Sequence, residues 1–312
     1  MPPYTSYPTA VQLTPAVQGD RYRAWLGEPG PTPPLSLYFH IPFCDNLCWF
    51  CGCHTKVVRR YAPIATYLDL LLRELELVAD LLPGRHKVCH VHLGGGTPTI
   101  LAPDRVCLFG YAHVPWMKKH QRLIDEARLP DAAERFAQYL AAAERLQEAG
   151  YLWIGLDHFA RPGGDLAKAA RDQTLRRNFQ GYTTDDAPVR LGFGPSAIGM
   201  LPQGLVQNEV SMKAYRDAIE AAVLQVARGL ALTADDRLRG AVIERLMCFL
   251  EADPRVFAGD PAALQEMAAG GLVEIDGWRV RVTEAGRPFL RTACAAFDSY
   301  LEPDAVRHAQ AV

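Results

Sequence analysis

Three cysteines within one short segment constrain this chain more than any other feature of its sequence. Cys44, Cys48 and Cys51 follow the spacing C-x3-C-x2-C. Three thiolates at this spacing can wrap a loop around one corner of a cubane 4Fe–4S cluster, and they leave the fourth iron without a protein ligand. We therefore expect this segment to bind such a cluster through these three residues.

The open iron of such a cluster can chelate the amino and carboxylate groups of S-adenosylmethionine. A reduced cluster can then pass one electron to the sulfonium group and release a 5′-deoxyadenosyl radical. The protein positions the cofactor and excludes water, while the cofactor carries the difficult chemistry. The cysteine spacing thus favours a radical S-adenosylmethionine (radical SAM) protein.

Two other interpretations of the cysteines stay open on the residues alone. One is a zinc site that also uses Cys53, although zinc prefers two separated ligand pairs and no second pair follows at zinc-finger distance. The other is thioredoxin-like redox chemistry at Cys48 and Cys51, which leaves Cys44 unexplained. The four remaining cysteines are expected to be buried thiols: Cys89, Cys107, Cys248 and Cys294.

Composition and charge exclude several classes of protein. The 312 residues carry 33 basic and 35 acidic side chains, a net charge of −2 that favours neither nucleic acid nor an anionic membrane as partner. The chain has no apolar run near the roughly eighteen residues of a membrane span, and no N-terminal signal pattern. We expect a cytoplasmic protein with no nucleic-acid and no membrane partner.

The segments around the cysteines read as a strand, a helix and a second strand. Their expected ranges are Leu35–Ile41, Tyr61–Leu82 and Val88–Leu93. On the helix, Arg73, Glu74 and Glu76 are expected to face water. A strand, a helix and a strand in this order form a βαβ unit, which requires a parallel sheet.

A glycine triplet follows the second strand. Gly94, Gly95 and Gly96 precede Thr97 and Pro98. Glycines at a strand end let a ligand approach the backbone, and their N–H groups can bind a carboxylate or amine partner. Such a triplet alone marks a tight turn as often as a site, but after a βα unit with three cysteines it favours a cofactor site.

The rest of the chain changes in character after its middle. Residues 155–210 are rich in Gly, Pro and Asn, with short motifs and few long elements. The expected elements are a strand over Arg105–Ala112, helices over Asp131–Ala149, Ser211–Arg228 and Ala234–Glu251, and a hairpin over Val273–Val282. We expect three parts: an extended arm (1–34), an α/β domain (35–205) and a helical domain with a small β-hairpin (206–312).

Several motifs resemble those of the oxygen-independent coproporphyrinogen III oxidases (coproporphyrinogen dehydrogenases), which are radical SAM enzymes. The segments that carry the resemblance are Tyr4–Ala10, Tyr38–Cys44, Leu47–Cys53, His92–Thr99, Gly155–Pro162 and Asn178–Thr184. The resemblance implies an oxidoreductase of porphyrin and haem biosynthesis. Its reaction is the oxidative decarboxylation of two propionates of coproporphyrinogen III to vinyl groups, which gives protoporphyrinogen IX.

The same resemblance implies roles for residues at matching positions. Cys44, Cys48 and Cys51 would hold the 4Fe–4S cluster. The first S-adenosylmethionine would be contacted by Tyr38, Gly95 and Ile198, and a second one by Phe50, Gly96, Thr97 and Ala112. Cys53 would not be a ligand. For Tyr38, Phe50 and Ile198, packing in the core is an alternative that stays open.

The substrate is a tetracarboxylate, so cationic side chains are expected around it. Arg161, Arg176 and Arg177 are candidates, because guanidinium groups bind carboxylates with two parallel hydrogen bonds. Solvated surface positions are the alternative for each. The implied reaction also needs an electron donor, and it needs no general base, so His40, His113 and His158 are as open to a structural role as to a catalytic one.

The chain departs from the family pattern between the glycine triplet and Arg105. Only residues 97–104 join them, so that roughly a hundred residues, about three βα units, are absent. We expect an incomplete radical SAM TIM-like barrel of the α/β class with a helical C-terminal domain. The strand over Arg105–Ala112 would pair antiparallel or not at all, because a parallel crossover needs about a dozen residues.

Apolar surface that faced the absent units would be exposed. We expect a monomer with lowered stability and little turnover. Three interpretations remain: a working enzyme, if needed completed by a partner chain; a non-catalytic iron–sulfur or haem-binding protein; and a deletion product that folds only in part.

Overall fold

The computed structural model describes residues 6–28, 33–44, 46, 48, 53–96, 105–108, 110–116, 118–253 and 261–301. Contacts divide the chain into two compact units. The sheet unit consists of residues 10–100 and 185–233, and the helical unit consists of residues 1–9, 101–184 and 234–312. The predicted three-part division at residues 34 and 205 stays a prediction.

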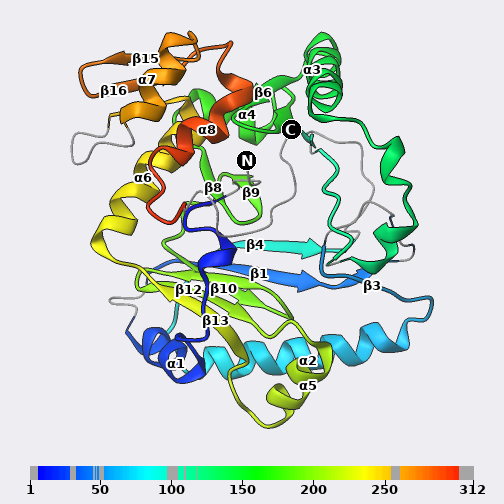
Figure 1. Cartoon of the computed structure of the whole chain (residues 1–312). Helices are drawn as coiled ribbons and strands as arrows, with labels where there is room; N and C mark the ends of the chain where they lie inside the picture. The colour runs from blue at the N-terminus through cyan, green and yellow to red at the C-terminus, as the bar shows by residue number, and fades with distance from the viewer. Residues whose placement is uncertain are drawn as a thin grey trace. The chain divides into compact units, whose positions relative to one another are not determined.

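The sheet unit is built on six strands in the order β13-β12-β11-β10-β1-β4 (Figure 1). Their bounds are β1 Leu35–Ile41, β4 Val88–Gly95, β10 Val189–Phe193, β11 Ile198–Leu201, β12 Gly204–Asn208 and β13 Val226–Ala231. Strand β1 pairs in parallel with β4 on one side and with β10 on the other, whereas β10 to β13 pair antiparallel. The predicted strands and their parallel pairing are confirmed.

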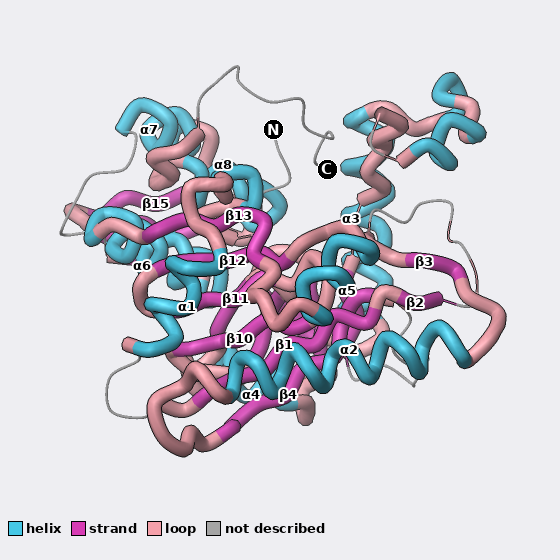
Figure 2. The backbone as a smooth tube through the Cα atoms, turned by 90° about the horizontal axis from the view of Figure 1, so that it is seen from below, coloured by secondary structure: helices cyan, strands magenta, loops and turns pink. Residues whose placement is uncertain are grey.

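Helices cover one face of this sheet. Figure 2 shows the long helix α2 (Ala62–Ala79) running along the strands. It packs on β10 and on α5 (Met212–Glu220), and α1 (Gly19–Gly27) packs on β13. The α2 side chains Tyr67, Leu70, Leu71 and Val78 enter the core, where each large apolar side chain contributes about 1.5–3 kcal/mol. The predicted helix is confirmed to within a few residues.

Two short strands close the base of the cysteine loop. Strand β2 (Phe43–Cys44) pairs with β3 (Lys56–Val57). The Lys56 N–H donates to the Pro42 carbonyl at 2.7 Å, and the Val58 N–H donates to the Cys44 carbonyl at 3.0 Å. The cysteine loop therefore begins at Cys44, and its other end, at Lys56–Val57, lies beside Phe43–Cys44.

The helical unit contains short sheets among helices. Its helices are α3 Ala132–Glu148, α4 Asp165–Arg171, α6 Ala234–Phe249, α7 Pro261–Ala269 and α8 Leu290–Ala295. Its strands are β5 Arg105–Cys107, β6 Leu152–Ile154, β7 His158–Ala160, β8 Arg176–Asn178, β9 Gly181–Thr183, β14 Glu251–Ala252, β15 Val273–Asp276 and β16 Arg279–Val282. Helix α3 starts at a capping box, in which Asp131 and Glu134 bond each other's backbone N–H groups.

Most elements predicted for this unit are confirmed, with two corrections elsewhere. The β15–β16 hairpin, α3 and α6 lie where expected. Strand β5 pairs antiparallel with β7 as expected, but it ends at Cys107 and not at Ala112. The predicted helix over Ser211–Arg228 is wrong in its last turns, because α5 ends at Glu220 and Val226 begins β13. The stretch 155–210 also holds β10 to β12, which the sequence did not indicate.

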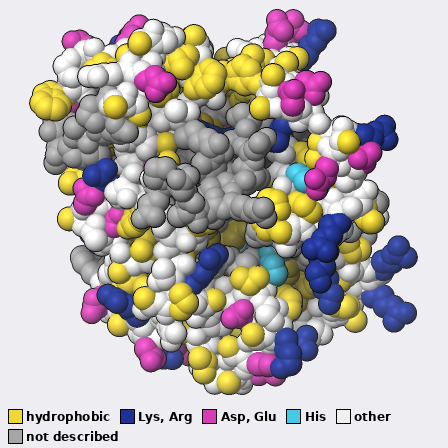
Figure 3. Space-filling view, viewed as in Figure 1, with side chains coloured by type: hydrophobic (Ala, Val, Ile, Leu, Met, Phe, Trp, Pro, Cys, Tyr) yellow, Lys and Arg dark blue, Asp and Glu magenta, His cyan; other side chains and the backbone are white. Residues whose placement is uncertain are grey.

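The outer side of β4 carries exposed apolar side chains. Val91 and Leu93 are 56% and 57% exposed, and Leu72 on α2 is 59% exposed. Among the described residues β4 pairs only with β1, and the sheet does not close into a barrel. Yellow apolar patches are visible on the face shown in Figure 3. The predicted exposure of apolar surface is confirmed.

In the part of the chain that the structure describes, no helix combines the length and the apolar character that crossing a membrane requires.

Candidate active site at the carboxyl ends of β1, β4 and β10

The three parallel strands end at one edge of the sheet. Phe39 of β1 lies opposite Phe193 of β10, and Ile41 lies opposite Gly95 of β4. The segments that follow these strands are the cysteine loop, the glycine triplet and the turn after Phe193. Open α/β sheets bind ligands at the carboxyl ends of their parallel strands, so this edge is the candidate site.

A buried tyrosine and histidine from β1 form the floor of the site. The Tyr38 hydroxyl lies 3.1 Å from His40 Nδ1, and His40 Nε2 lies 2.9 Å from the His54 carbonyl oxygen. A carbonyl only accepts, so Nε2 carries the proton and Nδ1 of a neutral ring accepts from Tyr38. Burial lowers the pKa of His40, which agrees with a neutral ring. Burial and, after it, the nearby Cys53 raise the pKa of Tyr38 to about 12, so Tyr38 keeps its proton.

The glycine triplet fits tightly against this floor. A side chain at Gly94 would meet the Tyr38 ring at 2.8 Å. Gly95 has φ +110°, which L side chains rarely adopt, and an added carbon there would lie 2.6 Å from the Ile41 carbonyl oxygen. The triplet is therefore required by close packing, as well as by any ligand that approaches it.

Gly96 connects the triplet to the cysteine loop. Its N–H donates to the Ile41 carbonyl at 2.7 Å. An added carbon at Gly96 would overlap the Phe43 carbonyl oxygen and would lie 3.1 Å from Cys44 Sγ. The structure thus places the thiol of Cys44 beside the last glycine of the triplet.

The two described cysteines of the loop have the properties expected of ligands to an iron–sulfur cluster. Cys44 is a half-buried free thiol at the sheet edge, and Cys48 is an exposed free thiol in the loop. Cys51 lies outside the described residues, and within the described ones no three His, Cys, Asp or Glu side chains are grouped to hold a metal ion. Soft thiolates on one loop, beside a glycine backbone that leaves room, fit an iron–sulfur cluster.

The other predicted contact residues are distributed between the two units. Ile198 begins β11, and its carbonyl carbon lies 2.9 Å from where a side chain of Gly192 would be, while Gly192 is paired with Tyr38. Strand β10 therefore lies between Ile198 on β11 and Tyr38 on β1. Ala112 belongs to the helical unit. The predicted contacts Phe50 and Thr97 lie outside the described residues.

The sequence did not indicate the polar groups that hold this edge together. Tyr67 of α2 donates its hydroxyl proton to the His40 carbonyl oxygen. Glu74, expected to face water, is buried, with 2% of its surface exposed, and the Gly194 N–H donates to it at 2.7 Å. This prediction was wrong because the partners of Glu74 lie more than a hundred residues away in the sequence. The expected burial was also wrong for Cys89 and Cys107, which are exposed, and is confirmed for Cys248 and Cys294.

The three predicted arginines all have partners within the helical unit. Arg161 lies over the Tyr151 ring at 4.9 Å, and Arg176 pairs with Glu244 at 3.3 Å. Arg177 is buried, 3.6 Å from Asp157 and 4.3 Å from the Tyr182 ring centre. These contacts favour structural roles for Arg176 and Arg177.

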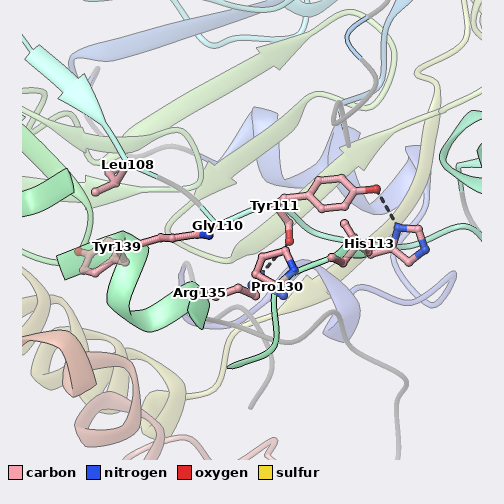
Figure 4. A pocket seen from close by; sticks show the side chains of 9 residues that line it. Leu108, Gly110, Tyr111, His113, Pro130, Arg135 and Tyr139 are labelled. Atoms are coloured by element: carbon pink, nitrogen blue, oxygen red, sulfur yellow. Dashed lines mark hydrogen bonds between the residues drawn. The ribbon is translucent and has the colours of Figure 1, made fainter. Parts of the chain in front are cut away.

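The helical unit has a cavity of about 220 Å³ that none of these arginines lines. Figure 4 shows Tyr111 and His113 from an extended segment and Arg135 and Tyr139 from α3 at its wall. The Tyr111 hydroxyl lies 2.8 Å from His113 Nδ1, and Arg135 donates to the Tyr111 carbonyl at 2.8 Å. Tyr111, His113 and Arg135 are therefore already bonded to one another.

Comparisons with known proteins agree with the arrangement of this site. No protein-family model matches the chain. It is 37% identical to oxygen-independent coproporphyrinogen III oxidase of Bradyrhizobium diazoefficiens, over all of this chain and 97% of the relative. It is 32% identical to coproporphyrinogen III oxidase, anaerobic 1, of Cereibacter sphaeroides, over all of this chain and 96% of the relative.

A solved structure agrees as well. Coproporphyrinogen III oxidase from Escherichia coli, described as a radical SAM enzyme, matches with a TM-score of 0.87 and 30% identity, over 96% of this chain and 97% of that one. The Bradyrhizobium alignment runs over 437 positions against 312 residues here, so 125 positions hold no residue of this chain. The expected absence of a large segment is thus confirmed. With this identity over its whole length and this site, the chain belongs to the family of oxygen-independent coproporphyrinogen III oxidases.

Proposed function

We propose that this chain is a radical SAM oxidoreductase that converts two propionates of coproporphyrinogen III to vinyl groups and so gives protoporphyrinogen IX. The observation that carries the proposal is the position of Cys44 beside Gly96, at the edge where β1, β4 and β10 end. The full-length identity to the named oxidases supports the same reaction.

In this proposal the cysteine loop holds the cofactor and the strand ends shape its surroundings. Cys44, Cys48 and Cys51 hold a 4Fe–4S cluster, which when bound and reduced supplies one electron to S-adenosylmethionine. Tyr38, Gly95 and Ile198 contact that molecule. The neutral His40, bonded on both ring nitrogens, fixes the Tyr38 hydroxyl and the loop carbonyl of His54.

A second S-adenosylmethionine is part of the proposal. Its contacts are Phe50, Gly96, Thr97 and Ala112, of which Gly96 and Ala112 lie within the described residues. An electron donor must reduce the cluster, and a cytoplasmic location would keep Cys44 and Cys48 as thiols. We expect turnover well below that of the longer relatives, because β4 leaves Val91 and Leu93 exposed and excluding water is part of such catalysis.

Anaerobic reconstitution tests the proposal directly. The protein is loaded with iron and sulfide, reduced with dithionite, and assayed for 5′-deoxyadenosine and protoporphyrinogen with and without coproporphyrinogen III. Substrate-dependent formation of both products is expected. A cluster that forms but never cleaves S-adenosylmethionine would contradict the enzymatic proposal and favour a non-catalytic iron–sulfur protein.

Two variants distinguish the ligand set within the same loop. Cys48→Ala should lose most of its bound iron after reconstitution. Cys53→Ala, a matched change five residues further along the same loop, should keep the iron content of the unsubstituted protein. Equal iron loss in both variants would instead support the zinc-like set of four cysteines.

A further inference from the structure

A carboxylate lies in the core of the sheet unit, and none of the described cationic side chains forms an ion pair with it. Glu74 of α2 is 2% exposed. Its Oε2 accepts from the Gly194 N–H at 2.7 Å and from the Tyr215 hydroxyl at 2.9 Å. Its Oε1 accepts from Asn208 Nδ2 at 2.8 Å and also from Gln225 Nε2. Four donors from four separate segments thus converge on one side chain.

Among the described residues, the ionisable groups that face Glu74 are tyrosines: Tyr22 of α1, Tyr67 of α2 and Tyr215 of α5. Burial and, after it, the charge of Glu74 raise the pKa of each above its ordinary value. No ion pair involves Glu74 among the described side chains. A buried carboxylate without a cation is unfavourable for stability, which points to a role other than stability.

The group that Glu74 holds is the turn between β10 and β11. Gly194 has φ +91° and Ser196 has φ +63°, so two residues of this turn lie in the left-handed region. Asn208, held by Glu74, also donates to the carbonyls of Gly192 at 3.1 Å and Gly194 at 3.0 Å. Such a strained turn persists only where surrounding bonds determine it.

This turn lies at the candidate site. A side chain on Gly194 would lie 2.7 Å from the His40 carbonyl oxygen, and the turn leads directly into Ile198. The same His40 carbonyl accepts from Tyr67, which lies about two helical turns before Glu74 on α2. Two buried polar side chains of helix α2, Tyr67 and Glu74, therefore hold the ends of β1 and β10 in place.

We propose that Glu74 is a positioning residue for the S-adenosylmethionine site, acting through Gly194 on the turn that carries Ile198. This inference rests on the proposed function for the identity of the ligand, and on the hydrogen bonds alone for the control of the turn. Glu74 touches no cofactor. It sets the position of backbone that does.

Only the ionised carboxylate can accept from all four donors. A protonated carboxyl group, or an amide, turns one acceptor into a donor that faces another donor. Burial raises the pKa of Glu74 to about 7, although the four hydrogen bonds oppose this. The turn should therefore loosen as pH falls through neutrality, and affinity for S-adenosylmethionine should fall with it.

The test compares Glu74→Gln with Glu76→Gln, an exposed position on the same helix. Hydrogen exchange of the peptide spanning residues 194–199 should rise about tenfold in the first variant, with no rise in α6 or α3. The Kd of the reconstituted Glu74→Gln protein for S-adenosylmethionine, measured calorimetrically, should be about tenfold higher than that of the unsubstituted protein at pH 8. The rise in Kd that the unsubstituted protein shows as pH falls through neutrality should be absent in this variant. Glu76→Gln should match the unsubstituted protein in both measurements.

Two outcomes would overturn the inference. One is unchanged exchange in residues 194–199, and the other is exchange raised equally throughout both units, which a merely structural role would give. Tyr215→Phe removes one donor and keeps the carboxylate, so a smaller rise in the same peptide is expected even if Glu74→Gln does not fold. The exchange measurement needs no turnover, so it separates this inference from the failure of the proposed reaction.

Discussion

The two units each bury a carboxylate, and they stabilise it in opposite ways. The described donors to Glu74 in the sheet unit are all neutral. Asp157 in the helical unit, 1% exposed, has His158 at 2.8 Å, Arg291 at 3.2 Å and Arg177 at 3.6 Å. Burial would raise the pKa of both carboxyls. The hydrogen bond from His158 and the two arginine charges outweigh burial and lower the pKa of Asp157, whereas the pKa of Glu74 rises to about 7.

This difference in partners indicates separate roles for the carboxylates of Glu74 and Asp157. Asp157 joins β7, β8 and α8 by charge, so it is expected to stabilise the helical unit. Glu74 joins α2 to the β10–β11 turn without a counter-charge, so its ionised form costs stability and sets geometry.

Asp157→Asn should show the largest effect. The change leaves Arg177 and Arg291 in the interior without their counter-charge, which typically costs about 3–5 kcal/mol. Denaturant unfolding followed by circular dichroism measures the loss. A cost below about 1 kcal/mol would mean that the arginines find other partners, and the contrast with Glu74 would fail.

The pH dependence of stability should show the next largest effect. Folded Glu74 keeps its proton up to about pH 7, while the unfolded chain releases it near its ordinary pKa. Between the ordinary pKa of Glu74 and about pH 7 the folded state therefore binds more protons than the unfolded state. The contribution of Glu74 to stability is fully present below its unfolded pKa and is lost as pH rises through about 7. The loss from pH 5 to pH 8 should reach about 3 kcal/mol at most.

The stability contribution of Asp157 changes with pH in the opposite direction. Its pKa is lowered on folding, so its stabilising contribution is present above its ordinary pKa and disappears only in acid. Urea unfolding of the unsubstituted protein and of Glu74→Gln at several pH values isolates the first effect. Parallel curves for the two proteins between pH 5 and pH 8 would contradict the raised pKa.

Tyr215→Phe should have an intermediate effect. It removes one hydrogen bond to a charged group and leaves the ring in the core, so a loss of about 1–2 kcal/mol in the free energy of unfolding is expected at pH 8. At pH 5, where Glu74 is protonated, the loss should be smaller. Equal losses at both pH values would show that the hydroxyl acts independently of the charge.

Asp165→Asn should show the smallest effect. Asp165 is an exposed carboxylate of α4 that lies 3.7 Å from Lys168. Exposed pairs of this kind contribute about 0–1 kcal/mol, so unfolding should barely change. This variant is the control for Asp157→Asn in the same unit, and a large effect in it would show that burial is not what separates the two carboxylates.

The elements around the site could be predicted where they are continuous and apolar. Strand β1 and helix α2 follow from the alternation and spacing of their own residues. The cysteine spacing and the glycine triplet also indicated a common site, and Gly96 does lie beside Cys44. These signals are local, so the sequence contains all that is needed to recognise them.

The elements that escaped prediction contain polar groups satisfied by distant partners. Strands β10 and β12 are wholly buried, yet they contain Arg190, Gln207 and Asn208. Arg190 is paired with Asp185 at 3.0 Å, and Asn208 with Glu74 at 2.8 Å. Without these partners the segments resemble surface loops, which is why the third parallel strand and the burial of Glu74 were both missed.

The open side of β4 has a consequence for how the protein behaves at different concentrations. The strand contains no Lys, Arg, Asp, Glu or Pro, the residues with which sheets commonly discourage further strand addition. Its outer backbone groups and exposed Val91 and Leu93 offer an incoming strand both hydrogen bonds and apolar contacts. The edge of the sheet at β4 can therefore accept a further strand, and the monomeric fraction should fall as the protein concentration rises.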